Sequence, residues 1–159
     1  MLLLAAREAV TQRFRHQAKA YGLTEQQWRV VRALAEVESL EIIALSAVCH
    51  IHSASLSRIL PKLGKAGLIS RCSNAADHRR VIVSLTPRGR RLLEELMPDS
   101  RKIYQQLARD VGPERLERMY AMLEEFITLL EVKKPDQAGP AEASVRRASR
   151  KLARREPEQ

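Results

Sequence analysis

HSASLSRILPKLGKAGLISRCSNAADHRRVIVSLTPRG, residues 52–89, is the stretch of the chain that decides the fold. Its first part favours a short helix, because Ser53 is a good N-cap and Gly67 is a typical helix stop. Between them the apolar side chains recur at helical spacing, at Leu56, Ile59, Leu60 and Leu63. The spacing therefore predicts an amphipathic helix that begins at Ser53 and ends before Gly67.

The second part of the stretch predicts a β-hairpin. Residues 68–70 and 81–85 are short runs rich in apolar and β-branched side chains, which is typical of strands. Residues 71–80 between them are polar and basic, and they suit a turn rather than a core. Thr86-Pro87 then begins a further helix, with Thr as N-cap and Pro at the first helical position. A helix followed by a basic-tipped hairpin predicts a winged helix, which fits a DNA major groove and the flanking minor groove.

Two more helices are predicted just before this stretch. Thr24 and Gln27 have the spacing of a capping box, which begins a helix, and residues 38–40 break its pattern. Residues 41–48 predict a third, short helix, and residues 49–52 are the turn that leads to Ser53. Two short helices joined by about four residues have the spacing of a helix-turn-helix.

Long helices are predicted at both ends of the domain. Residues 2–20 carry an apolar stripe, and residues 87–110 carry another, which Pro98 should kink or interrupt. After a break at Gly112-Pro113 comes the clearest amphipathic stripe of the chain. A helix this apolar needs a partner, so we expect these helices to pack together and against a second subunit. A symmetric dimer would place its recognition helices about 34–36 Å apart on a palindromic operator.

These elements define the expected fold class, mainly α with a small β-wing. Residues 1–132 form the domain, in which 24–87 are the winged helix-turn-helix and 2–22 and 88–132 are the dimerisation helices. Residues 133–159 change character and predict a basic, disordered tail. This tail holds eight basic and four acidic residues. It either binds a phosphate backbone or is simply solvated, and the sequence leaves both interpretations open.

The composition narrows the choice of partners. A formal charge of +9 favours an anionic partner, such as nucleic acid or an acidic membrane. No stretch approaches the ~20 apolar residues of a membrane span, and the apolar start of the chain is too short for a signal peptide. Two cysteines without a framework pattern indicate a reducing compartment, so we expect a cytoplasmic protein. No glycine-rich phosphate loop or catalytic motif is present, so neither an enzyme nor a cofactor is expected.

The wing and its exit carry a family resemblance. Asp77-His78-Arg79-Arg80, followed by Val83-Ser84-Leu85-Thr86-Pro87-Arg88-Gly89, resembles the D-x-R…V-x-L-T-x-x-G pattern of the MarR family of bacterial winged-helix repressors. The resemblance covers roughly residues 2–132. AREAV at 6–10 and LTEQQWRVVRALAE at 23–36 are similar to the subgroup that regulates homoprotocatechuate and 4-hydroxyphenylacetate degradation.

The resemblance implies a homodimer that binds DNA, and it implies a role for particular residues. The residues that would face the major groove or its phosphates are Ser53, Ser55, Ser57, Arg58 and Lys62. Arg79 matches the wing arginine that enters the minor groove, and Asp77 matches the acid that holds it, with Arg80 beside them. A guanidinium suits the negative potential of a narrow minor groove, and a nearby carboxylate can fix its orientation.

The recognition helix departs from the family pattern at two positions. Pro61 and Gly64 stand where the family has helix formers, and they cost about 3 and 1 kcal/mol in propensity. We therefore expect the N-terminal half, from Ser53 to Arg58, to be the reading end.

The resemblance also implies a small aromatic effector, bound between the dimerisation helices and the winged helix. Arg15 is a candidate to pair with its carboxylate, and His16, Trp28 and Arg29 are candidates for further contacts. Alternatively, Trp28 is a core residue and Arg15 is an exposed charge or part of an intersubunit ion pair. The cysteines and the nearby histidines lack the spacing of a zinc site, so no metal is expected.

The sequence therefore predicts a repressor of an aromatic catabolic operon. The expected effector is an acid similar to 4-hydroxyphenylacetate or homoprotocatechuate, or a hydroxylated pyridine carboxylate such as a nicotinate. The alternative is a general nucleoid-type DNA-binding protein without an effector, which the basic tail favours.

Overall fold

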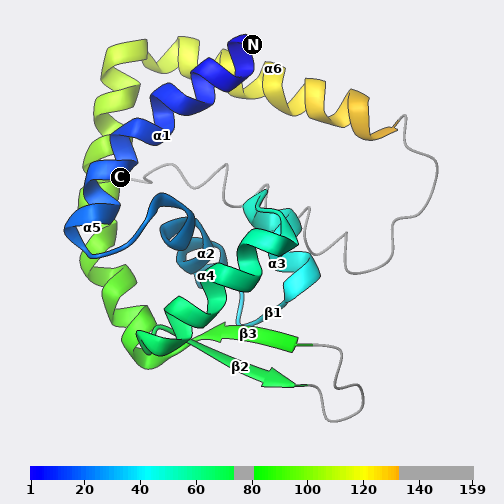
Figure 1. The fold of residues 1–159 in the computed structure, drawn as a ribbon. Coiled ribbons are helices and arrows are strands. Elements are labelled where there is room, and N and C mark those ends of the chain that lie inside the picture. The colour runs from blue at the N-terminus through cyan, green and yellow to red at the C-terminus, as the bar shows by residue number, and fades with distance from the viewer. Residues whose placement is uncertain (74–80, 133–159) are drawn as a thin grey trace.

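The structure, a computed structural model, describes residues 1–73 and 81–132 (Figure 1). The helices are α1 (Leu2–Ala20), α2 (Glu25–Ala35), α3 (Ile42–Cys49), α4 (Ser53–Lys65), α5 (Pro87–Val111) and α6 (Pro113–Val132). The strands are β1 (Leu40–Glu41), β2 (Ile69–Ser73) and β3 (Val81–Leu85). The predicted fold class, mainly α with a small β-wing, is confirmed.

The sheet is antiparallel and has the order β1-β3-β2. Ile69 pairs with Leu85 at the base of the hairpin, and Ser73 pairs with Val81 where its described part ends. The first hairpin strand thus begins and ends later than the predicted 68–70. Strand β1 was not predicted, because it has two residues and its partner Val83 is distant in the sequence.

The core lies between α2, α3, α4 and the sheet. Val30, Val31 and Leu34 of α2 are completely buried, and Leu45 of α3 and Leu56 of α4 are as well. The capping box of α2 is confirmed, because the Thr24 hydroxyl accepts from the Gln27 amide and the Gln27 side chain accepts from the Thr24 amide. The buried side chains of α2 and the sheet therefore support α3 and α4 from the inner side.

Helix α4 runs unbroken through Pro61 to Lys65. Pro61 is exposed, whereas the neighbouring Leu60 and Leu63 are 1% exposed. Burying a leucine side chain contributes about 1.5–3 kcal/mol, which offsets the propensity cost of the proline. Ser53 is the first helical residue and His52 is the N-cap, so the predicted cap was wrong by one position. The exposed Ser53 hydroxyl lies 3.4 Å from that of Ser46 instead.

The base of the wing is tightly packed against the start of α5. Gly67 has φ +70° and turns the chain from α4 into β2. The Thr86 hydroxyl donates to the Gly67 carbonyl at 2.6 Å and accepts from the Gly89 amide at 3.0 Å. Gly89 lies so close to Leu68 that an added Cβ would meet the Leu68 carbonyl. The wing and α5 are therefore one packed unit at this point.

Helix α5 also runs unbroken through its proline, so Pro98 does not interrupt it. Helix α1 packs beside this segment and supplies extra hydrogen bonds to its backbone. The Gln17 amide donates to the Leu96 carbonyl at 2.8 Å and to the Ser100 hydroxyl at 2.9 Å. The Tyr21 hydroxyl donates to the Glu95 carbonyl at 3.2 Å. These contacts stabilise the turn of α5 in which the proline lacks an N–H donor.

Candidate nucleic-acid interface and effector site

Helices α3 and α4 form the helix-turn-helix. Their axes differ in direction by 105°, within the range of this motif. The turn between them passes through His50, which has the left-handed φ of 48°, and the Ser46 hydroxyl donates to the Ile51 carbonyl at 2.7 Å. Because the apolar side of α4 is buried, its polar side faces outward.

The structure places the predicted DNA-contacting residues of α4 on its outer surface. Ser57, Arg58 and Lys62 are exposed, and Ser55 is half-buried. The Ser57 hydroxyl donates to the Ala54 carbonyl at 2.8 Å, which leaves its oxygen available as an acceptor. A helix with such a surface can present hydroxyl groups and cations to base edges and phosphates.

The wing consists of β2 and β3. The hydroxyls of Ser70 and Ser84 are 2.7 Å apart across the two strands, which supports the register of the hairpin. The predicted tip residues Asp77, Arg79 and Arg80 lie outside the described residues. The strands that lead to them extend away from the start of α5 (Figure 1).

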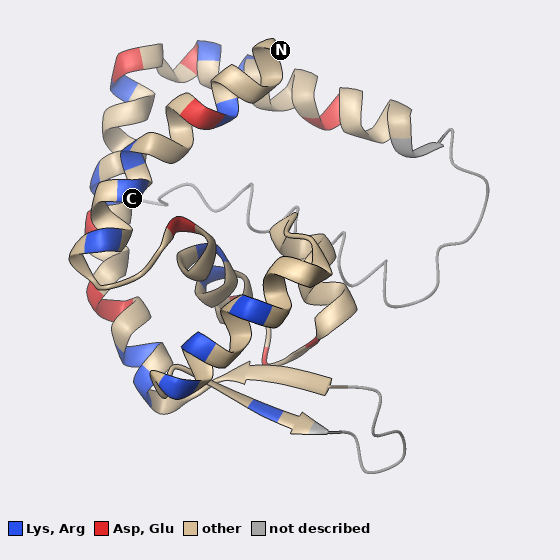
Figure 2. Ribbon diagram, viewed as in Figure 1, with Lys and Arg blue, Asp and Glu red and all other residues tan. Residues whose placement is uncertain are grey.

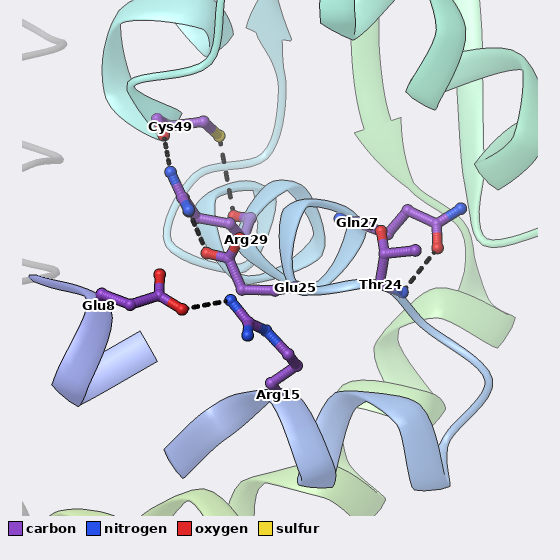
Figure 3. Close-up of polar contacts among 7 residues, drawn as sticks. All are labelled: Glu8, Arg15, Thr24, Glu25, Gln27, Arg29 and Cys49. Atoms are coloured by element: carbon purple, nitrogen blue, oxygen red, sulfur yellow. Dashed lines mark hydrogen bonds and ion pairs between the residues drawn. The ribbon is translucent and has the colours of Figure 1, made fainter. Parts of the chain in front are cut away.

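The four predicted effector residues do not form one cluster. Arg15 is exposed and its guanidinium donates to Glu8 at 2.8 Å, and His16 is exposed beside it (Figure 3). Trp28 is 4% exposed and belongs to the core. Arg29 pairs with Glu25 and donates to the Cys49 carbonyl at 3.1 Å, so it connects α2 to the end of α3 (Figure 3).

A different cationic group lies where α1, α2 and α5 meet. The Arg32 guanidinium donates to the Tyr104 hydroxyl, and its carbon lies 5.2 Å from the centroid of the Tyr104 ring. The Phe14 ring is tilted against the same tyrosine, with 4.9 Å between the centroids. Arg32 and Tyr104 are both half-buried. This arrangement combines a cation, a hydroxyl and two aromatic rings, which are the groups that bind a small aromatic acid.

Sequence reasoning missed Arg32 and Tyr104. The available signal was that Arg32 follows Trp28 by one helical turn and therefore shares its face of α2. Nothing in the sequence pairs it with a tyrosine 72 residues further on.

Neither cysteine belongs to a group of metal-ligating side chains among residues 1–73 and 81–132. In the part of the chain that the structure describes, no three His, Cys, Asp or Glu residues gather where they could hold a metal ion. Cys49 is buried, and burial raises the pKa of its thiol to about 12. Its thiol is therefore neutral at physiological pH, and it lies 3.7 Å from the Arg29 carbonyl.

Among the described helices none is by itself long and apolar enough to span a bilayer, and α3 and α4 reach that composition only as a sharply bent pair.

The fold and the outward face of α4 define a winged helix-turn-helix DNA-binding protein. The MarR family model matches residues 23–81. The chain is also 36% identical over 140 residues to the homoprotocatechuate degradative operon repressor of Escherichia coli, which is 88% of this chain and 95% of that repressor. The chain belongs to the MarR family of transcriptional regulators, which are DNA-binding proteins and not enzymes.

Two solved structures are similar over most of the chain. NadR in complex with 4-hydroxyphenylacetate has a TM-score of 0.76 and 32% identity, over 83% of this chain and 96% of NadR. BpsR of Bordetella bronchiseptica, whose DNA binding is regulated by 6-hydroxynicotinic acid, has a TM-score of 0.72 and 26% identity, over 79% of this chain and 95% of BpsR. The resemblance inferred from the wing residues is thus confirmed.

Proposed function

We propose that this protein is a cytoplasmic, homodimeric repressor of genes for aromatic-compound catabolism, released from a palindromic operator by a small aromatic acid. The observation that carries the proposal is the winged helix-turn-helix beside the Arg32–Tyr104 cluster. The relatives support it, because one represses an operon for homoprotocatechuate degradation and two bind or respond to aromatic acids.

The exposed apolar surface of the terminal helices supports the homodimer. On α6, Met122 is 71% exposed, and four more large apolar side chains, Phe126, Ile127, Leu129 and Leu130, are about half exposed. Leu2, Leu3 and Leu4 of α1 are also exposed, at the same end of the molecule (Figure 1). Soluble monomers rarely expose so large a contiguous apolar surface. We therefore assign dimerisation to residues 2–22 and 88–132, and the winged helix-turn-helix to residues 24–87.

The DNA contacts follow from the outward face of α4 and the wing. The side chains that reach the major groove or its phosphates are Ser53, Ser55, Ser57, Arg58 and Lys62. Arg79 enters the minor groove, Asp77 holds its guanidinium, and Arg80 is the flanking cation. A two-fold axis would give each half-site one recognition helix, so a palindromic operator fits this arrangement.

Arg32 is the best-supported receptor for the carboxylate of the effector. It is half-buried, so water screens its charge less than that of the exposed Arg15. The Tyr104 ring lies against it, the Phe14 ring packs against Tyr104, and Trp28 shares its side of α2. Arg15 and His16 remain candidates at the outer side of α1, and Arg29 transmits displacement of α2 to the end of α3 through Cys49. A coupling of about 1–3 kcal/mol would weaken operator binding about 5–150-fold.

Fluorescence anisotropy with the DNA upstream of the protein's own gene tests the proposal. An unrelated duplex at the same salt concentration is the control, and the acids are 4-hydroxyphenylacetate, homoprotocatechuate and 6-hydroxynicotinate. We expect tight, selective binding that one acid releases. Arg32→Gln should keep operator affinity and lose the release, whereas Lys102→Gln, a control on the exposed surface of α5, should lose neither. Equal binding to both duplexes, unchanged by any acid, would support the nucleoid-type alternative instead.

A further inference from the structure

A row of basic side chains follows one face of α4 beyond its reading end. Arg58, Lys62 and Lys65 are all exposed and are spaced four and three residues apart. At 100° per residue they lie within about 60° of one another around the helix. Figure 2 shows them as blue segments that follow one another along α4 towards its C-terminal end.

The row continues on the first turns of α5. Arg88 lies over the turn that ends α4, because an added Cβ on Gly67 would be 3.8 Å from the Arg88 Cδ and 3.9 Å from one of its guanidinium nitrogens. Arg91 is three residues further on and shares that side of α5. In Figure 2 the blue end of α4 lies next to the blue start of α5. We call Arg58, Lys62, Lys65, Arg88 and Arg91 the basic row.

No described side chain compensates these charges. None of the five residues makes a hydrogen bond or an ion pair with another residue among 1–73 and 81–132. The arginines lie near the N-terminus of α5, where the helix dipole disfavours cations. The first turn of α5 contains no acidic residue that could offset this effect. Five like charges in one row repel each other, and an anionic surface along the row would relieve this repulsion.

We propose that Arg88 and Arg91, which follow the base of the wing beside the C-terminal end of α4, bind phosphates of the operator backbone. This inference rests on the proposed function, because it extends the contact surface of the same DNA. The described part of the hairpin extends away from the start of α5, the helix that carries this arginine pair (Figure 1). Each protomer would therefore contact the backbone at two separate places, one through the wing and one through the arginine pair. Such contacts position the protein without reading sequence.

The test compares Arg88→Gln/Arg91→Gln with a matched control, Arg90→Gln. Arg90 is exposed too, but it lies about 160° from Arg88 around the helix. Affinity for the operator and for an unrelated duplex is measured over a series of salt concentrations. The double variant should lower the slope of log K against log[salt] by about 1.8 for each bound protomer, from about 0.9 for each lost phosphate contact. Both duplexes should lose affinity by the same factor, and Arg90→Gln should change neither slope nor affinity.

Arg88→Lys/Arg91→Lys separates loss of charge from misfolding, because it retains both cations and should restore the slope. A double glutamine variant with the slope of Arg90→Gln overturns the inference. The inference is also overturned if the double glutamine variant loses affinity for the operator and not for the unrelated duplex, because the two arginines would then contact bases and not phosphates. If the wild-type protein does not prefer its operator, the proposed function fails. If it does prefer the operator while the variants have unchanged slopes, only the present inference fails.

Discussion

Gly89→Ala should destabilise the domain at the junction of wing and α5. The added methyl group would lie 3.1 Å from the carbonyl carbon of Leu68, closer still to its oxygen, and 3.2 Å from a Leu85 methyl carbon. The oxygen belongs to the backbone and already accepts from the Thr86 amide at 3.1 Å, so it cannot move without loss of that bond. Overpacking of this kind costs about 1–3 kcal/mol, and a lost hydrogen bond costs about 1 kcal/mol more.

The gain from replacing glycine in a helix offsets at most about 1 kcal/mol of this cost. We therefore expect a net destabilisation of about 1–4 kcal/mol, which lowers Tm by about 2–16 °C in a chain of this size. Gly64→Ala is the matched control, because nothing lies within 4 Å of its added Cβ. It should stabilise α4 by up to about 1 kcal/mol.

Urea and thermal unfolding at one fixed protomer concentration measure both variants, because the proposed dimerisation would make stability concentration-dependent. Operator affinity of the folded Gly89→Ala protein should also fall, since the wing base is displaced. A Gly89→Ala protein as stable as Gly64→Ala would refute the packing that we describe between wing and α5.

Three further outcomes are expected. Arg79→Ala should weaken operator binding strongly and leave the dimer intact in a sedimentation experiment; unchanged affinity would remove the wing from the mechanism. Deletion of residues 134–159 should lower affinity for unrelated DNA and flatten its salt dependence by about 0.9 per lost phosphate contact, whereas an unaltered slope would make the tail inert. Hydrogen bonds from Arg13 and Gln106 hold the pKa of Asp110 below its usual 3.8, so the stability from this carboxylate is present above that pH and is lost as pH falls through the lower folded value. Asp110→Asn should therefore show a weaker acid dependence of Tm than the wild-type protein, and an identical dependence would contradict this assignment.

Local signals predicted the elements that depend on neighbouring residues. The capping box at Thr24 and Gln27 and the N-cap and proline at 86–87 each act within one helical turn. The hairpin followed from β-branched runs on either side of a polar turn. These patterns work because the hydrogen bonds and side-chain contacts that they describe are close in sequence.

Contacts between distant residues were not predictable in this way. Strand β1 forms because Leu40 meets Val83, and the Arg32–Tyr104 contact forms because α2 packs against α5. Both contacts depend on how the helices and strands assemble. The spacing of apolar residues shows only which face of each element is buried, and not which other element covers it. The predicted effector residues failed to cluster for the same reason, since Trp28 is buried in the assembled core and Arg29 donates to Cys49 at the end of α3.

The buried amide of Gln17 has a consequence for how a signal could travel through the domain. Its NH₂ group and its oxygen both have partners on α5, and the Ser100 hydroxyl is one of them. Sliding α1 by one turn would leave these groups without partners in an apolar environment, which is unfavourable for each of them. Helices α1 and α5 should therefore move together, and in the proposed mechanism an acid bound beside Arg32 would shift α2 relative to this pair. In that mechanism the shift would reach α3 through the hydrogen bond from Arg29 to Cys49 and would change the position of the recognition helix.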